Sequence, residues 1–190
     1  MSTSQRNVIV VLHGCNFVGV LNHAIKAPGN TYEKLRIDYK AFLQYLARGR
    51  NIIGAYYVSQ YDPQIHQNRP KSDQERNNKF FTQLSKFGWT PLQTTYDIMY
   101  SDTSNTLTTL WESIISPYYK DGNLTLDINN TDVVVVTGSS TWSNILYAFK
   151  DIGFNVDLAF VPKATNKQLA YKYNFIDISS FLISQYSARG

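Results

Sequence analysis

The chain has 190 residues and carries 18 lysines and arginines against 14 aspartates and glutamates, for a net charge of +4. A hydrophobic share of 43% excludes an intrinsically disordered chain, and the single cysteine, Cys15, excludes a disulfide framework and a multi-cysteine zinc site. With no signal-peptide pattern and no apolar run near the roughly 20 residues of a membrane span, we predict one intracellular, cytoplasmic domain over residues 1–190.

Apolar, β-branched segments alternate along the chain with amphipathic ones. The expected strands are residues 8–12, 51–58, one within residues 89–100, 132–137 and 154–161. Four longer helices are expected: residues 38–49, a segment with Phe80, Phe81 and Leu84 that ends at Gly88, residues 102 or 104 to 115, and residues 141–152, which end at Gly153. Two short helices are expected near residues 166–173 and 179–186. Strands that alternate with helices predict an α/β fold with a doubly wound, mostly parallel sheet and helices on both faces.

Three further local features are predicted from composition and spacing. Leu107, Leu110, Trp111, Ile114 and Ile115 follow a helical spacing and predict one apolar helix face. An Asp-Gly pair predicts a hairpin or an exposed insertion over residues 118–131. Residues 62–78 are strongly polar and are expected to form a loop.

The chemistry of an open parallel sheet is expected beyond the carboxyl ends of its strands, where such folds bind ligands. Three segments lie there by the predicted order: residues 13–16 (HGCN), residues 59–62 (SQYD) and residues 137–142 (TGSSTW). Candidate site residues are therefore sought in these segments.

The same segments resemble NYN domains of the PIN-like (LabA-like) nuclease superfamily. Residues 8–17 (VIVVLHGCNF) are similar to the family's opening strand, which ends in Asp-Gly-x-Asn, and residues 132–160 are similar to its strand, Ser-Gly-Asp-x-Asp-Phe motif, helix and following strand. Residues 36–59, 78–89 and 175–179 continue the pattern. The resemblance implies a PIN-like fold and a ribonuclease ancestry, and the Asn- and Tyr-rich composition resembles that of viral and phage proteins.

The chain departs from that family where the family holds Mg²⁺ or Mn²⁺ with carboxylates. The positions that the resemblance makes acidic carry His13, Ser139 and Thr141, while Asn16 matches the motif. Hydroxyls and one imidazole do not replace anionic oxygens around a hard cation. We therefore expect a catalytically degenerate domain without a cofactor, which binds nucleic acid, RNA foremost, or serves as a protein-interaction module.

Two alternatives stay open. An active endoribonuclease would need a rearranged Mg²⁺ or Mn²⁺ site or metal-free chemistry, for which the candidate catalytic residues are His13, Asp62 and Asp102. Asp102 is interpreted first as a helix cap, and Asp62 before a proline as part of a turn. A structural or assembly protein would instead bind a protein partner or form a homo-oligomer through the insertion at residues 118–131.

The residues at the predicted strand ends can either bind a ligand or simply pack within the fold. His13 is expected to be a neutral, hydrogen-bonded residue at the end of a buried strand, Cys15 a small buried residue, and Trp142 part of the core. The residues predicted to bind a ligand, through hydroxyls and amides that open a helix, are His13, Asn16, Thr137, Gly138, Ser139, Ser140 and Thr141, and simple capping explains the last five equally well.

Contacts to single-stranded RNA are predicted on a different part of the chain. Arg69, Lys71 and Arg76 are candidates for phosphate contacts, and Tyr61 for stacking on a base. A solvated loop and tyrosines that face the core are the simpler interpretation of the same residues.

Overall fold

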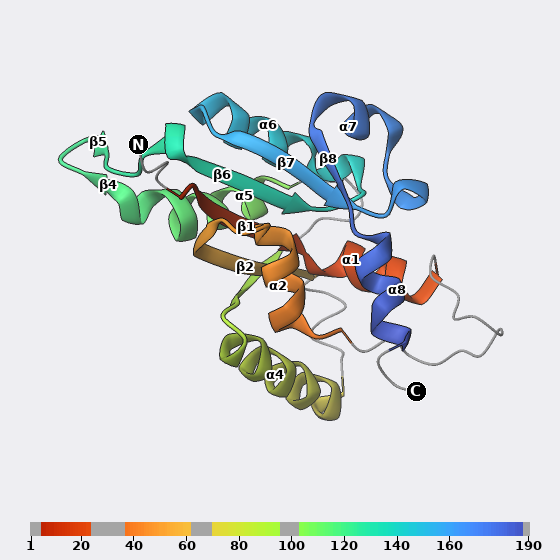
Figure 1. Ribbon diagram of the computed structural model, residues 1–190. Coiled ribbons are helices and arrows are strands. Elements are labelled where there is room, and N and C mark those ends of the chain that lie inside the picture. The colour runs from red at the N-terminus through yellow and green to blue at the C-terminus, as the bar shows by residue number, and fades with distance from the viewer. Residues whose placement is uncertain (1–4, 24–36, 62–69, 96–102, 188–190) are drawn as a thin grey trace.

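The computed structural model describes residues 5–23, 37–61, 70–95 and 103–187, and its main feature is one six-stranded sheet (Figure 1). Its strands are β1 (Asn7–His13), β2 (Asn51–Tyr61), β3 (Thr90–Thr95), β6 (Thr131–Val136), β7 (Asn155–Phe160) and β8 (Asn174–Asp177). They lie in the order β3-β2-β1-β6-β7-β8, and every neighbouring pair is parallel. The predicted α/β fold with a doubly wound sheet is confirmed.

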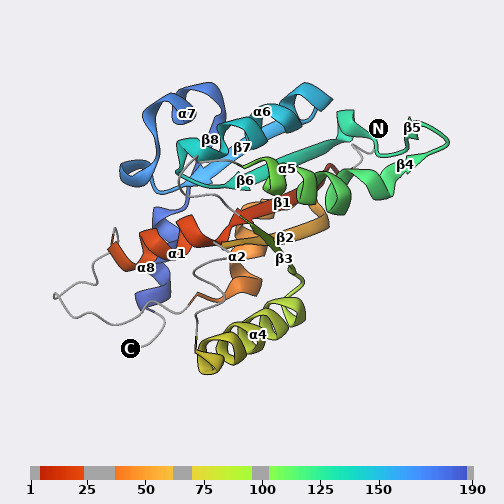
Figure 2. The same ribbon diagram turned by 180° about the vertical axis from the view of Figure 1, so that it is seen from behind.

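Helices cover both faces of this sheet, as Figures 1 and 2 show from opposite sides. One face is covered by α1 (Gly14–His23), α2 (Tyr39–Ala47), α4 (Lys71–Lys86) and α8 (Ser179–Ser187). The other face is covered by α5 (Ser104–Leu110), the π-helix η1 (Trp111–Ile115), α6 (Ser143–Ile152) and α7 (Lys167–Lys172). Short 3₁₀ turns connect them: η2 (Ser116–Tyr118), η3 (Ile128–Asn130), η4 (Ser140–Trp142) and η5 (Pro162–Ala164).

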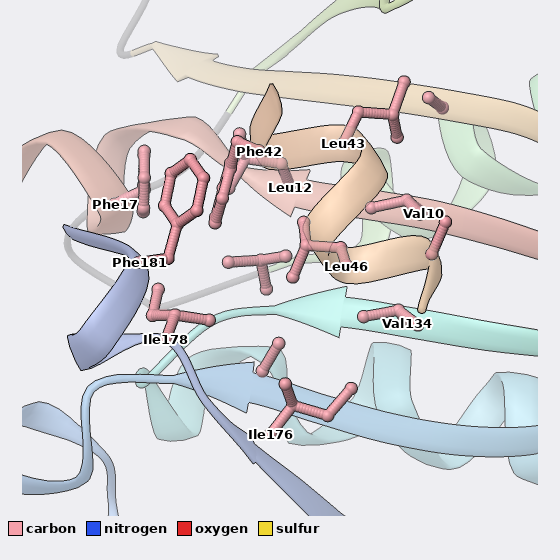
Figure 3. Close-up of a cluster of buried hydrophobic side chains, with 14 of the residues drawn as sticks. Val10, Leu12, Phe17, Phe42, Leu43, Leu46, Val134, Ile176, Ile178 and Phe181 are labelled. Atoms are coloured by element: carbon pink, nitrogen blue, oxygen red, sulfur yellow. The ribbon is translucent and has the colours of Figure 1, made fainter. Parts of the chain in front are cut away.

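The two central strands are continuously apolar because both of their faces are buried. All six residues of β6 are buried, as are six of the seven in β1. Alternate side chains enter different cores: Val10 packs with α1, α2 and α8, whereas Val11 packs with α5 and α6. Figure 3 shows the first of these cores, in which the rings of Phe17 and Phe42 stack with their centroids 5.1 Å apart.

Several predicted boundaries are confirmed by their caps and turns. The Asp38 side chain accepts hydrogen bonds from Lys40 N at 3.0 Å and Ala41 N at 2.9 Å, and so begins α2. The predicted hairpin exists as β4 (Tyr119–Lys120) and β5 (Asn123–Leu124). Its turn residues Asp121 and Gly122 have φ of 51° and 77°, which the Asp-Gly pair adopts readily.

The expected polar loop is wrong from Lys71 onward, because α4 occupies residues 71–86; residues 62–69 lie outside the described residues. The segment 71–79 consists mostly of good helix formers, and Asp73 in the first turn favours the helix dipole. Leu84 is the buried residue of this helix. The first half of α4 therefore has no apolar periodicity in its sequence.

Two further elements were not predicted. α1 directly follows β1, and glycines at positions 14 and 19 with nearby valines give it a weak helix signal. The edge strand β8 has four residues and a single buried one, Ile176, so it lacks the continuous apolar run of the central strands.

Trp111 departs from the predicted apolar helix face. It begins the π-helix η1, whose wider turn disrupts the 3.6-residue periodicity. Leu110 and Ile114 stay buried, but Trp111 is 41% exposed. The hydroxyl of Tyr56 donates to the carbonyl oxygen of Ser113 at 3.3 Å, which anchors this turn to β2.

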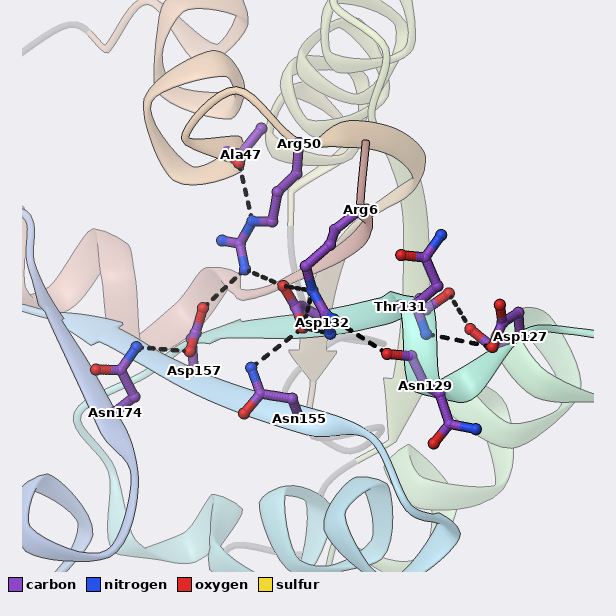
Figure 4. Close-up of polar contacts among 11 residues, drawn as sticks. Arg6, Ala47, Arg50, Asp127, Asn129, Thr131, Asp132, Asn155, Asp157 and Asn174 are labelled. Carbon is purple, nitrogen blue, oxygen red and sulfur yellow. Dashed lines mark hydrogen bonds and ion pairs between the residues drawn. The ribbon is translucent and has the colours of Figure 1, made fainter. Parts of the chain in front are cut away.

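A buried ionic network ties the strands together at the amino edge of the sheet (Figure 4). The Arg50 guanidinium lies 2.9 Å from a carboxylate oxygen of Asp132 and 2.9 Å from one of Asp157. Arg6 also pairs with Asp132, and the Asn155 side-chain amide donates to the Asp132 carboxylate at 3.1 Å. Burial alone would raise the pKa of the Asp132 carboxyl. The hydrogen bonds from these three side chains lower it by more, so the pKa is held at about 2.

No helix among the described residues is long and apolar enough to cross a membrane.

Candidate functional site

The strand order reverses between β1 and β6, the place where open α/β sheets bind ligands. His13 ends β1, Thr137 follows β6, and Asn16 lies in the first turn of α1. Hydrogen bonds join all three, and Gln60 contacts both Cys15 and Trp142, so the structure brings all three predicted segments together at this edge. We call the set of His13, Asn16 and residues 137–141 the switch-point site.

His13 is held as a neutral residue at the centre of this site. It is 5% exposed, its Nδ1 lies 3.0 Å from Thr137 Oγ1, and its ring stacks on Trp142 with centroids 4.2 Å apart. Burial lowers the pKa of the imidazole to about 3, and a hydrogen bond with Gln60 opposes this shift only in part. A group with this pKa is a weak general base, as expected for a residue that packs and positions its neighbours.

Asn16 clamps the loop that follows β6. Its Oδ1 accepts from Gly138 N at 2.8 Å, while Thr137 Oγ1 accepts from Ser139 N at 3.2 Å. Ser139 Oγ accepts from Thr141 N at 3.3 Å and lies 2.8 Å from the Thr141 hydroxyl. Three of the backbone amides predicted to bind an anion here, those of Gly138, Ser139 and Thr141, therefore already have side-chain acceptors within the protein.

Gly138 is required by a close backbone approach. A Cβ placed on this residue would lie 2.4 Å from the carbonyl oxygen of Ala164 and 2.4 Å from the ring of Phe160. The same contact is held by a hydrogen bond from Asn166 N to Gly138 O at 2.9 Å.

We predict that Gly138→Ala lowers the free energy of unfolding by about 1–3 kcal/mol, because a backbone carbonyl and a packed ring must both move. Chemical denaturation monitored by tryptophan fluorescence measures this change. Gly19→Ala is the matched control, since a Cβ at this helical position meets no atom within 4 Å and is expected to be neutral or stabilising by up to about 1 kcal/mol. An unchanged stability for Gly138→Ala would contradict the close approach.

Gln60 completes the site; it lies in the predicted segment 59–62 but was not itself a candidate site residue. Its Oε1 accepts from Trp142 Nε1 at 3.3 Å, and its Nε2 donates to Thr106 Oγ1 at 2.8 Å. It thereby links the end of β2 to α5 and to the ring that stacks on His13. Because glutamine at the end of a strand is common on protein surfaces, no pattern in the sequence identifies this role.

Cys15 is exposed, so its prediction as a small buried residue is wrong. The first turn of α1 directs Phe17 into the core and leaves Cys15 outward, with its Sγ donating to the carbonyl oxygen of Gln60 at 3.1 Å. Trp142 is fully buried, as expected.

The described residues contain no group of three or more His, Cys, Asp or Glu side chains that could hold a metal ion. Asp132 and Asp157 are buried and paired with arginines at the amino edge, opposite the switch-point site. The candidate catalytic residues Asp62 and Asp102 lie outside the described residues.

The predicted nucleic-acid contacts do not come from a single loop. Lys71 and Arg76 are exposed on α4, where Arg76 pairs with Asp73 at 2.7 Å, and Arg69 lies outside the described residues. Tyr61 is half-buried at the end of β2. The end of α4 that carries Lys71 follows the carboxyl end of β2, on the α2 side of the sheet.

Comparison with known proteins gives a structural neighbour and no family. No family model matches the chain, and no curated protein matches it. The chain is similar to the crystal structure of a protein of unknown function from Vibrio parahaemolyticus, with 15% sequence identity and a TM-score of 0.61, over 94% of this chain and 96% of that one. At this identity the likeness shows the fold alone.

Proposed function

We propose that the protein is a catalytically degenerate NYN/PIN-like domain that binds single-stranded RNA without cleaving it. One observation carries the proposal: His13, Ser139 and Thr141, which stand where the resemblance implies acids, lie at the switch point within one hydrogen-bonded network of neutral groups. Such a set offers no anionic oxygen to a divalent cation. It also removes the carboxylates that would repel a phosphate.

The distribution of charge supports a polyanionic partner. Arg6 and Arg50 are paired with Asp132 and Asp157, so these two positive and two negative charges cancel at the amino edge. The net charge of +4 therefore belongs to the rest of the chain. Excess positive charge of this kind supplies salt-dependent affinity for nucleic-acid backbones.

The experiment is a titration of a fluorescently labelled, short single-stranded RNA, followed by anisotropy in EDTA and then by gel analysis with Mg²⁺ or Mn²⁺. Saturable binding that weakens with salt, with intact RNA in either metal, is the expected result. Absence of binding at low salt would overturn RNA binding. Metal-dependent cleavage that Asp62→Asn or Asp102→Asn abolishes would instead establish the active endoribonuclease.

We predict that Lys71→Ala reduces the slope of log affinity against log salt by about 0.7, the value for one lost phosphate contact with a single strand. Lys71 is exposed at the start of α4, so its removal leaves the fold unchanged. Lys120→Ala, on the hairpin beyond the amino edge, is the matched control and is expected to keep the slope. Equal slopes for both variants would remove α4 from the RNA interface.

A protein-interaction role is the second candidate, and an exposed aromatic pair formed by η1 and the hairpin favours it. Trp111 is 41% exposed, Tyr119 is 44% exposed, and their ring centroids lie 5.8 Å apart. Exposed aromatic pairs are typical of interfaces. Light scattering across a range of protein concentrations tests this: an oligomer that Trp111→Ser dissociates supports the role, and a monomer at all concentrations excludes self-association.

A further inference from the structure

The hydroxyl of Tyr57 is buried and forms no hydrogen bond with any described residue. Tyr57 is 4% exposed, and burial raises the pKa of its phenol above the ordinary value, so the hydroxyl keeps its proton. Buried polar groups in native proteins almost always have a partner, and an exception calls for a bound group or a functional role.

This hydroxyl lies against the first residue of α1. A Cβ placed on Gly14 would be 2.6 Å from the Tyr57 hydroxyl oxygen and 2.4 Å from the ring carbon that bears it. The glycine is thus required by the tyrosine, whose phenol end occupies the space of a side chain at position 14. Gly14 belongs to the sequence motif at residues 13–16, whereas Tyr57 lies on the neighbouring strand outside it.

The tyrosine ring is fixed in place by other aromatic rings. Its centroid lies 6.2 Å from that of Tyr39, 5.4 Å from that of Phe80 and 6.3 Å from that of Phe81. None of these neighbours is ionic. Because the ring cannot rotate away without breaking this packing, the hydroxyl is held at the beginning of α1 before any ligand binds.

The beginning of α1 supplies further donors. The first amides of a helix have no acceptor within it, and the helix dipole places positive potential there. The first turn of this ten-residue helix contains no acidic residue, and Cys15 next to Gly14 is exposed. At the loop after β6, by contrast, Asn16, Thr137 and Ser139 already accept from the backbone amides.

We infer that the Tyr57 hydroxyl and the first turn of α1 form an anion subsite that takes a phosphate group. Every group in this set is a neutral donor, which matches the acceptor oxygens of phosphate. The phosphate can belong to a free phosphate or nucleotide, or to the backbone of RNA. The inference does not depend on RNA binding, because the donor set requires only the anion.

The test follows the backbone amide resonances of Gly14, Cys15 and Asn16 by NMR while inorganic phosphate replaces chloride at constant ionic strength and pH. Saturable shifts confined to these amides and their neighbours are expected in the wild type. Tyr57→Phe, which deletes only this hydroxyl, is expected to weaken phosphate binding about tenfold or more, as for loss of a hydrogen bond to a charged group. Tyr147→Phe, at a tyrosine that is 65% exposed, is the matched control and should bind like the wild type.

Each outcome decides the inference. Absence of saturable shifts at Gly14–Asn16 in the wild type overturns it without any variant, and equal affinity in Tyr57→Phe overturns it as well. Titrations with uridine 5′-monophosphate and with a dinucleotide then distinguish a terminal phosphate from a phosphodiester, and uridine is the phosphate-free control.

The same experiment separates this subsite from the proposed function. Phosphate binding without any RNA binding keeps the subsite and overturns the RNA proposal. RNA binding in a protein whose Gly14–Asn16 amides show no saturable shifts with phosphate keeps the RNA proposal and overturns the subsite.

Discussion

Replacing Arg50 by methionine is expected to lower the free energy of unfolding by about 3–5 kcal/mol. The Arg50 side chain is 14% exposed, and its guanidinium bridges the carboxylates of two aspartate side chains that are each 5% exposed. It also donates to the carbonyl oxygens of Ala47 and Leu46, at the end of α2. Methionine keeps much of the side-chain length but leaves Asp157 buried without its cation and Asp132 with Arg6 alone.

Urea or guanidinium unfolding of the variant measures this loss. Arg76→Met is the matched control, because Arg76 pairs with Asp73 on the surface, with the two side chains 78% and 38% exposed. Exposed pairs contribute little, so the control is expected to change stability by less than about 0.5 kcal/mol. Similar losses for the two variants would show that the amino-edge network contributes no more than a surface ion pair.

Lowering the pH from 7 to 5 is expected to cost about 2 kcal/mol of stability through His13 alone. Its pKa is about 3 in the folded protein, because of burial, against 6.5 for an ordinary histidine. Above pH 6.5 the residue is neutral in both states, so stability is at its full value. As the pH falls below 6.5 the unfolded chain binds a proton that the folded chain does not, and stability declines until about pH 3.

His13→Gln isolates this effect, since glutamine can still hydrogen-bond to Thr137 but does not titrate. The difference in unfolding free energy between wild type and His13→Gln is expected to shrink as the pH is lowered from 7 to 5. A constant difference would mean that His13 is protonated in the folded protein at an ordinary pKa. Below about pH 4 both proteins are expected to lose further stability, because the Asp132 carboxyl, whose pKa is held at about 2, binds a proton more readily when unfolded.

The elements with strong local signals could be predicted from sequence. The apolar segments of β1 and β6, the Asp38 cap of α2 and the Asp-Gly hairpin turn are each determined by residues close together in the chain. α4 was predicted too short at its beginning, because an exposed polar helix leaves no apolar stripe to detect.

The candidate site divides in the same way. His13, Asn16 and residues 137–141 could be chosen in advance, because the carboxyl ends of parallel strands meet at one edge of the sheet. Residues 59–62 were placed at this edge as well, but the roles of Gln60 and Tyr57 could not be predicted, because they depend on contacts with Trp142 and with Gly14 that no spacing in the chain encodes.

Composition and pattern by themselves determined that this protein is an α/β fold with its polar motif beyond the strand ends. Only the tertiary structure decided how the few charges are used: Arg6 and Arg50 neutralise Asp132 and Asp157 at the amino edge, which leaves the net charge of +4 to the rest of the chain. It also decided that His13 stays neutral and that side-chain oxygens of Asn16 and Thr137 accept from the amides of Gly138 and Ser139. The physical reason is that burial and hydrogen bonding depend on which strands become neighbours, and β1 and β6 are far apart in the chain.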